Sequence, residues 1–341
     1  MPRPRLSRCA RSPHHPDAAI GIVLANVYEF SGQPQAAYDV LRARLAPAPG
    51  DVRLLLAASH AAALTGDDAA ALAHAEAAHA RAPDAGAALE ALCTACLAVG
   101  DAPRALALAR RRLAQDPQGQ MALALTATAA RLAGDSQHDR IYDFDAFVRA
   151  DRIDVPEGWP DLVSYLADLK QALDRLHVFK AHPLDQSLRG GSQTTQPLLQ
   201  LDDPAIKAFF RAVDRPIRDY MNAVGSGSDP LRARNTGAYR IKGAWSVRLR
   251  ATDYHIDHIH PQGWLSSAFY VETPGAVERG HEGWLAFGRP AFRTRPTLEP
   301  GRWERPEPGK LVLFPSYLWH GTAPFSSDET RMSLAFDVIP A

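Results

Sequence analysis

The chain has 341 residues, which is long enough for two domains that each bury a core. Lys plus Arg and Asp plus Glu each number 38, so the net charge is zero and nothing favours a general nucleic-acid or membrane-surface binder. The three cysteines fit a reducing compartment, and we expect a cytoplasmic protein. Cys93 and Cys96 form a Cys-x-x-Cys inside an Ala/Leu-rich helical run, which favours packed thiols over a redox or metal pair.

The start of the chain predicts no secretory signal. Residues 1–16 carry four arginines and no apolar core region, so we expect a flexible tail. No run of 18 or more apolar residues follows, and we therefore expect no membrane span.

A 34-residue period runs through residues 17–134, which are rich in alanine and leucine. Three sets of positions recur at this spacing: Gly32, Gly66, Gly100 and Gly134; Pro49, Pro83 and Pro117; Ala37, Ala71 and Ala105. We expect each glycine to end a first helix in a left-handed cap and each proline to close a second helix. This pattern resembles the tetratricopeptide family. The resemblance implies a helical solenoid, whose concave face often binds a peptide or protein. The alternative is that the repeats only brace the neighbouring domain or mediate a homodimer.

The composition changes at Asp135, where aromatic residues enter and alanine becomes less frequent. We interpret residues 135–180 as a helical connector. Apolar residues at helical spacing predict one helix over 162–176 and a second over 204–221. Two helices ahead of a strand-rich region suggest a helical support that lies against one sheet.

From Gly237 onward the sequence predicts strands separated by turns rich in proline and glycine. The expected strands cover 245–250, 265–272, 284–287, 310–314 and 331–339. Several short strands of this kind are typical of a sandwich or a jelly roll. The predicted fold class is therefore α+β, with an α-solenoid followed by a jelly-roll domain over residues 181–341.

Residues 254–261, Tyr-His-Ile-Asp-His-Ile-His-Pro, pack three histidines and an aspartate into one short stretch. Another histidine, His320, lies downstream, and Arg331 follows it by eleven residues. Two close ligands, one distant ligand and a trailing arginine are typical of a mononuclear non-haem iron site with room for a keto-acid co-substrate.

Strand parity leaves two sets of metal ligands open. Side chains two apart share a face, so His255 points with Asp257 and His258 points with His260, toward opposite faces. The first pair with His320 would form a two-His-one-carboxylate triad, whereas the second pair would form an all-His set.

Three segments carry a resemblance to a known family: His258–Val271 (HIHPQGWLSSAFYV), Gly309–Thr322 (GKLVLFPSYLWHGT) and Arg331–Asp337 (RMSLAFD). They resemble the 2-oxoglutarate/Fe(II) oxygenase family of bacteria and phage, over about residues 180–341. The resemblance implies a double-stranded β-helix and the cofactors Fe(II) and 2-oxoglutarate, with O2 as a co-substrate. A His-x-His-Pro precedes the Leu-Ser strand in that family, so the resemblance favours His258 and His260, with His320, as iron ligands.

The last predicted strand carries a candidate co-substrate site. Arg331 and Ser333 share one face, and a guanidinium with a hydroxyl suits the distal carboxylate of 2-oxoglutarate. The alternative is an ordinary surface face of a half-buried strand. Further candidates for the pocket lining are Tyr239, Trp245, Ser266 and Tyr270, although aromatic residues in strands more often belong to a core.

The resulting functional hypothesis is an Fe(II)/2-oxoglutarate-dependent oxygenase that hydroxylates a peptide or protein side chain presented by the repeats. The alternative is a non-catalytic tetratricopeptide scaffold whose jelly roll binds a metal or small molecule. Arg331 with Ser333 favours the enzyme, because a scaffold does not need them. A zinc hydrolase is a third hypothesis, but no glutamate is placed as an obvious general base.

Overall fold

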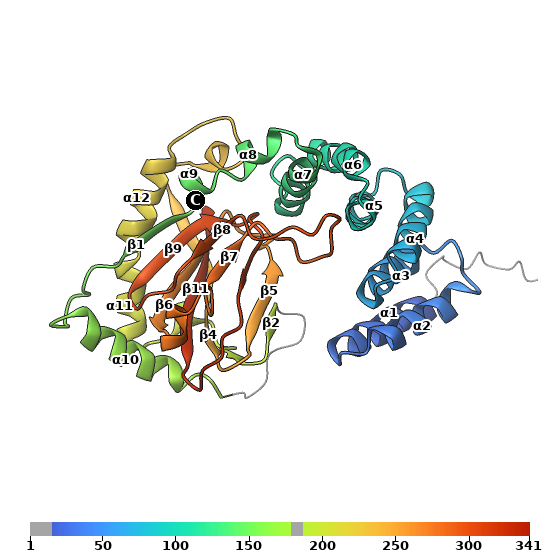
Figure 1. Ribbon diagram of the computed structural model, residues 1–341. Coiled ribbons are helices and arrows are strands. Elements are labelled where there is room, and N and C mark those ends of the chain that lie inside the picture. Colours follow the sequence, from blue (N-terminus) through green and yellow to red (C-terminus); the bar gives the residue numbers. More distant parts are fainter. Residues whose placement is uncertain (1–15, 179–186) are drawn as a thin grey trace, which may run out of the picture. The chain divides into compact units, whose positions relative to one another are not determined.

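The computed structural model describes residues 16–178 and 187–341 (Figure 1). The expected tail lies outside the described residues, apart from Pro16, which begins the first helix. The chain divides into two compact units between Val99 and Gly100. No helix among the described residues is long and apolar enough to cross a membrane.

The described part of the first unit is a row of helices in which each packs against the next. They are α1 (Pro16–Phe30), α2 (Pro34–Leu45), α3 (Val52–Thr65), α4 (Asp68–Arg81) and α5 (Gly86–Val99). Alanines make this close packing possible, since Ala37 and Ala71 are only 0% and 1% exposed. Cys93 and Cys96 are buried within α5, in agreement with the prediction of packed thiols.

The repeated glycines have the conformation that the 34-residue period predicts. Gly32, Gly66, Gly100 and Gly134 have φ angles of 71°, 91°, 89° and 67°, a region that only glycine enters without strain. The N–H of Gly66, for example, caps α3 by donating to the carbonyls of Ala62 and Ala63. The helix–turn–helix repeat is therefore confirmed.

The second unit begins with helices that continue the repeat and lead into the sheets. Its helices are α6 (Ala102–Gln115), α7 (Gln120–Ala133), α8 (Gln137–Ile141), α9 (Phe144–Phe147), α10 (Leu162–Asp174), α11 (Pro204–Ala212) and α12 (Asp214–Val224), with the short 3-10 turns η1 (Leu198–Gln200), η2 (Arg232–Arg234) and η3 (Gly275–Glu278). Leu123 and Ala127 of α7 share one apolar core with the sheets. The compact unit therefore begins one helix pair before the change of composition at Asp135.

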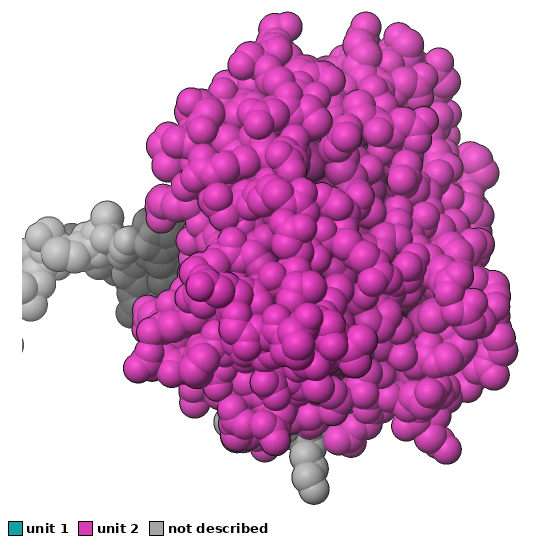
Figure 2. All heavy atoms as spheres, turned by 90° about the vertical axis from the view of Figure 1, so that its left-hand side faces the viewer, with its two compact units in different colours: residues 1–99 teal, residues 100–341 magenta. Residues whose placement is uncertain are grey.

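The single helix expected over 204–221 is wrong in detail, because α11 ends at Ala212 and α12 begins at Asp214. Pro216 explains the break. In a continuous helix its ring would clash with the carbonyl of Ala212 and remove one hydrogen bond. Both helices still support the sheet as expected: Phe209 of α11 contacts Phe269, with ring centroids 4.9 Å apart. Figure 2 shows the surface of the second unit on this side.

Two antiparallel sheets form the jelly roll. The larger sheet has the order β1-β9-β6-β11-β4-β3 and the smaller has the order β2-β5-β10-β7-β8. The strands of the larger sheet are β1 (Arg149–Arg152), β3 (Ser192–Gln193), β4 (Tyr239–Leu249), β6 (Leu265–Glu272), β9 (Lys310–Pro315) and β11 (Arg331–Pro340). Those of the smaller sheet are β2 (Leu188–Arg189), β5 (Tyr254–His258), β7 (Leu285–Phe287), β8 (Arg302–Glu304) and β10 (His320–Thr322). From β4 to β11 the chain crosses repeatedly between the sheets, which confirms the double-stranded β-helix and the α+β class.

Helix α7 is bonded to the loop that leads into β10. The indole Nε1 of Trp319 donates to Thr128 Oγ1 at 3.1 Å. Within the same loop, the Trp319 backbone N–H donates to the Tyr142 hydroxyl at 3.2 Å, and that hydroxyl donates to the Tyr317 carbonyl at 3.0 Å. Helix α7 and the residue that caps α8, Tyr142, therefore brace the residues immediately before His320.

Replacing Thr128 by valine should lower the free energy of unfolding by about 1–3 kcal/mol, because the buried Trp319 indole loses its acceptor. Thr126 is a matched control on the same helix. Both hydroxyls donate to the carbonyl four residues earlier, at 2.7 Å for Thr126 and 2.8 Å for Thr128, but only Thr128 accepts from an indole. Urea denaturation of both valine variants tests the brace, and equal losses would contradict it.

Candidate metal and co-substrate site

Three histidines meet where β5 and β10 lie side by side. His258 ends β5 and His320 begins β10, and the antiparallel register places them directly opposite each other. His260 follows two residues after β5. The ring centroids are 4.3 Å apart for His258 and His320, 5.2 Å for His258 and His260, and 5.0 Å for His260 and His320. One potential ligand atom from each residue lies within 4.8 Å of the other two.

Backbone carbonyls set the tautomer of two of these rings. His258 Nδ1 lies 2.8 Å from the Ile256 carbonyl, and His320 Nδ1 lies 2.8 Å from the Leu318 carbonyl. Because a carbonyl only accepts, each Nδ1 must carry the proton. The lone pair is therefore on Nε2, the atom that would bind a metal. Ser187 Oγ lies 3.3 Å from Nε2 of His258 and would have to give way to a metal there.

Burial keeps these rings neutral, which is the form that binds metal. It lowers the pKa of His258 to about 3, and it holds the pKa of His320 well below its ordinary value. Burial outweighs the carbonyl hydrogen bonds, which act in the opposite direction. At neutral pH both imidazoles are therefore ready to coordinate a metal without losing a proton first.

The third ring, His260, is held by a carboxylate that the sequence reasoning missed. His260 Nδ1 lies 2.5 Å from Asp337 Oδ1, so this ring also keeps its proton on Nδ1. Ser266 Oγ donates to the same oxygen at 2.8 Å. Strand alternation alone could have indicated Asp337, because it lies on the same face of β11 as Arg331 and Ser333, the face of the odd-numbered residues.

The alternative ligand pair, His255 with Asp257, is not brought together. In the pairing of β5 with β10, His258 lies opposite His320 and His255 lies opposite Thr322. Three residue steps along β5 therefore match only two along β10. This β-bulge turns His255 toward the same pocket as His258, contrary to the regular alternation. Asp257 points to the opposite face.

The surroundings of these two side chains differ accordingly. His255 Nδ1 lies 2.9 Å from Ser187 Oγ, next to the triad. Asp257 Oδ2 instead accepts from Arg289 Nε at 2.6 Å. Burial raises the pKa of Asp257, while its ion pair with Arg289 opposes that rise. A carboxylate bound in this way on the far face is not available to a metal in the pocket.

Arg331 is a buried cation at the other end of the pocket. It is 2% exposed, its Nε donates to the Gly283 carbonyl at 3.0 Å, and Nη1 lies 3.5 Å from Ser333 Oγ. No carboxylate among the described residues forms an ion pair with it. Burial lowers its pKa, but a guanidinium remains charged in proteins. A buried charge without a counter-ion costs several kcal/mol, so the site favours an anionic ligand.

Tyr270 lies beside this guanidinium, whose carbon is 5.0 Å from the centre of the phenol ring. Burial raises the pKa of Tyr270 to about 12, so its hydroxyl stays protonated and can donate. Arg331, Ser333 and Tyr270 together suit a carboxylate, while the three Nε2 atoms suit Fe(II). The residues present therefore fit both Fe(II) and a keto acid with a second carboxylate.

The remaining candidate pocket residues divide into two groups. Trp245 lines the pocket, with its ring centroid 5.5 Å from that of His260, and Ser266 acts indirectly through Asp337. Tyr239 was wrongly included in the pocket lining. Its hydroxyl donates to Asp214 Oδ1 on α12 at 2.6 Å, because a bulge in β4 near Lys242 reverses the faces of the residues before it.

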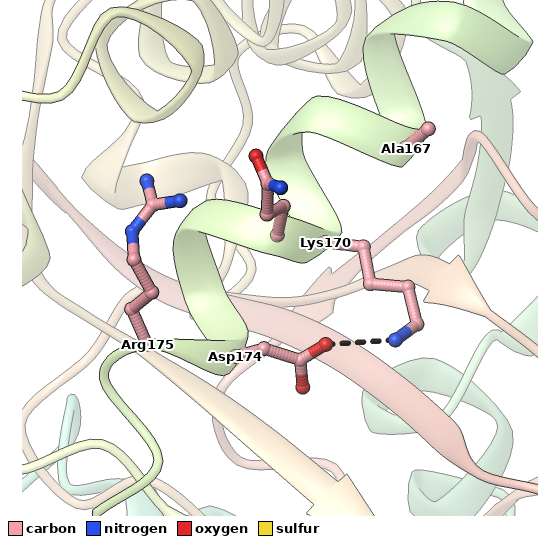
Figure 3. A pocket seen from close by; sticks show the side chains of 5 residues that line it. Ala167, Lys170, Asp174 and Arg175 are labelled. Atoms are coloured by element: carbon pink, nitrogen blue, oxygen red, sulfur yellow. Dashed lines mark hydrogen bonds and ion pairs between the residues drawn. The ribbon is translucent and has the colours of Figure 1, made fainter.

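A second hollow, on α10, has a different character (Figure 3). Lys170 Nζ lies 2.7 Å from Asp174 Oδ2, and Asp174 Oδ1 accepts from Arg248 Nη1 at 3.2 Å. Lys170 Nζ also lies 3.7 Å from Glu272 Oε2, so two cations face two carboxylates at this surface hollow, whereas Arg331 has no described carboxylate partner. We therefore place the functional site in the pocket of the jelly roll.

Comparison with known families identifies the class of this domain. Residues 243–337, less than a third of the chain, match the family described as "Putative 2OG-Fe(II) oxygenase". The histidine triad and Arg331 lie within that segment. This part of the chain is a 2-oxoglutarate/Fe(II) oxygenase domain, a class of enzyme that uses Fe(II), 2-oxoglutarate and O2. No curated protein is significantly similar to the chain.

Several solved structures are similar to a part of the chain. The viral collagen prolyl hydroxylase of Paramecium bursaria Chlorella virus-1, solved with 2-oxoglutarate, is 12% identical; the match covers 57% of this chain and 97% of that one, with a TM-score of 0.39. A Pseudomonas putida prolyl-4-hydroxylase is 15% identical, with coverages of 58% and 96% and a TM-score of 0.39. The first tetratricopeptide domain of human RPAP3 is 18% identical, with coverages of 36% and 95% and a TM-score of 0.33. Matches at this level say nothing about substrate.

Proposed function

We propose that the pocket holds Fe(II) on His258, His260 and His320 and 2-oxoglutarate on Arg331, and that the enzyme hydroxylates a peptide or protein side chain. The observation that carries the proposal is the pairing of three convergent imidazole nitrogens with a buried guanidinium that lacks a described carboxylate partner. When bound, the iron and 2-oxoglutarate supply the chemistry: O2 converts the keto acid to succinate and CO2, and a substrate C–H becomes C–OH.

The residues of the chain have distinct tasks in this reaction. The three histidines would hold the metal through their Nε2 atoms and would leave coordination positions open for the co-substrates. Arg331 and Ser333 line the same pocket and would bind the distal carboxylate of the keto acid, which would hold that co-substrate in one orientation. The sheets around the pocket exclude water from the reacting atoms, which prevents wasteful side reactions.

A macromolecular substrate is supported by the repeats. Helix α7 braces the jelly roll, whereas the first unit has an apolar face of its own on α1. Ile20, Val23 and Val27 lie along α1 and are 60%, 63% and 52% exposed. Contiguous exposed apolar side chains often mark a binding surface, and tetratricopeptide arrays commonly bind peptides. We propose that this face recruits the protein that is hydroxylated.

We expect the full chain, with Fe(II), 2-oxoglutarate and O2, to release succinate and to add the mass of one oxygen atom to a protein in a cell extract. The double variant Val23→Glu with Val27→Glu should keep succinate release without substrate but lose most protein hydroxylation. Val163→Glu is the control, because Val163 on α10 is 78% exposed and belongs to the other unit. Mass spectrometry and a succinate assay give the two readouts.

The outcomes separate the two parts of this proposal. Succinate release that is stimulated only by small free molecules would contradict a protein substrate. Equal protein hydroxylation by wild type and the α1 variant would contradict recruitment by α1. Absence of both metal binding and succinate release would contradict the enzyme itself.

A further inference from the structure

The three histidines differ in what holds their Nδ1 atoms. His258 and His320 donate to backbone carbonyls, which are neutral, whereas His260 donates to the carboxylate of Asp337. Within the described residues, Asp337 is the one carboxylate that contacts any ring of the triad. The site therefore contains a single negative charge, and it lies behind one ligand instead of on the metal.

The carboxylate of Asp337 would change the charge that the three histidines bring to a metal, because His260 donates to it. A two-His-one-carboxylate triad brings one negative charge to the metal, whereas three neutral imidazoles bring none. Arg331 adds a positive charge to the same pocket. An all-His site of this kind is electron-poor unless another group compensates, and an imidazole that donates to a carboxylate is a stronger electron donor.

Hydrogen bonds from neighbouring residues hold the Asp337 carboxylate in place next to His260. It lies on β11 opposite Ser266 of β6, whose hydroxyl donates to Asp337 Oδ1, the atom that also accepts from His260. Ser266 Oγ in turn lies 2.9 Å from Ser316 Oγ, and the backbone N–H of His260 donates to the Ser316 carbonyl at 3.0 Å. His260 and its carboxylate are thus tied to the same small network.

We propose that Asp337 is a positioning residue for the metal centre: it fixes the ring and tautomer of His260 and supplies, through that ring, the negative charge that a carboxylate ligand would otherwise bring. The inference rests on the proposed function. Asp337 does not touch the metal in this arrangement. Its effect passes through His260 to the affinity of the site for metal and to the electron density on the iron.

Two substitutions separate orientation from charge. Asp337→Ala removes both, and we expect Fe(II) to bind about 10- to 100-fold more weakly, the range found when outer-shell partners of ligating histidines are lost. Asp337→Asn keeps the size and an acceptor oxygen for His260 Nδ1–H but removes the charge, so its affinity should lie between those of wild type and Asp337→Ala. Anaerobic titration with Fe(II), or with Co(II) as a stable substitute, measures the affinity.

A spectroscopic readout reports on charge alone. Fe(II) with bound 2-oxoglutarate has a weak visible band in which an electron moves from the metal to the keto acid. Removing the charge behind His260 makes the iron harder to oxidise, so this band should move to shorter wavelength in Asp337→Asn. A residue that only supports the fold would lower the fraction of active protein without moving the band.

Asp257→Asn is the matched control, because Asp257 is on β5 between two of the pocket histidines but faces Arg289. It should leave both the metal affinity and the band unchanged. Wild-type affinity and an unmoved band in Asp337→Asn would overturn the inference, even if wild type is an active oxygenase. If the wild-type protein binds neither Fe(II) nor Co(II), both the proposed function and this inference are wrong.

Discussion

Alanine at position 320 is expected to abolish Fe(II) binding and succinate release. His320 offers one of three converging nitrogens, and its loss should cost more than the roughly 100-fold that removal of an outer-shell partner can cost. Anaerobic metal titration and the succinate assay measure both effects. Because His320 is buried, His320→Gln provides a variant of closer volume with the same expected loss.

His255→Ala is the control for this experiment. His255 lies in the same pocket, with its ring centroid 5.8 Å from that of His258, but it is outside the set of converging ligand atoms. We expect its variant to keep metal affinity. Loss of metal in His255→Ala together with retention in His260→Ala would show that the ligand set proposed above is wrong.

Replacing Arg331 by methionine should weaken 2-oxoglutarate binding by about 1.5–3 kcal/mol, roughly 10- to 150-fold in KM, because the distal carboxylate loses its charged donor. The metal affinity should not change. The free energy of unfolding of the ligand-free protein should not fall, since the variant no longer buries a cation that lacks a described counter-ion. Steady-state kinetics and urea denaturation measure the two quantities.

Arg248→Met is the matched control. Arg248 lies on the neighbouring strand β4, opposite Met332 of β11, and is already paired with Asp174 at 3.2 Å. Its loss should leave the KM for 2-oxoglutarate unchanged. An unchanged KM in the Arg331 variant as well would remove Arg331 from the co-substrate site.

The regular features of this fold could be predicted from the sequence because they follow simple periods. The 34-residue repeat placed the glycine caps, and β6 was expected at the residues where it is found, 265–272. The alternation of β11 correctly separated Arg331 and Ser333 from the apolar side chains that pack on the helices. These predictions needed only local geometry.

The irregular features could not be predicted in this way. The bulge in β5 turned His255 into the pocket, and the bulge in β4 turned Tyr239 out of it. A bulge depends on the pairing of two strands, which local alternation does not reveal. Asp337 was within reach of a parity argument, but its contact with His260 depends on the register of distant strands. The break between α11 and α12 is an exception, because Pro216 predicts it, but the apolar side chains that continue along one face of both helices favoured a single helix.

The odd face of β11 also limits how this strand can change in length. Arg331 and Asp337 are six residues apart on one face, so they lie about 20 Å apart along the strand. Inserting one residue between them would turn one of the two charges toward the helices, whereas inserting two would keep both faces but lengthen the spacing. Insertions and deletions here should therefore be tolerated less than substitutions at the positions between these two residues.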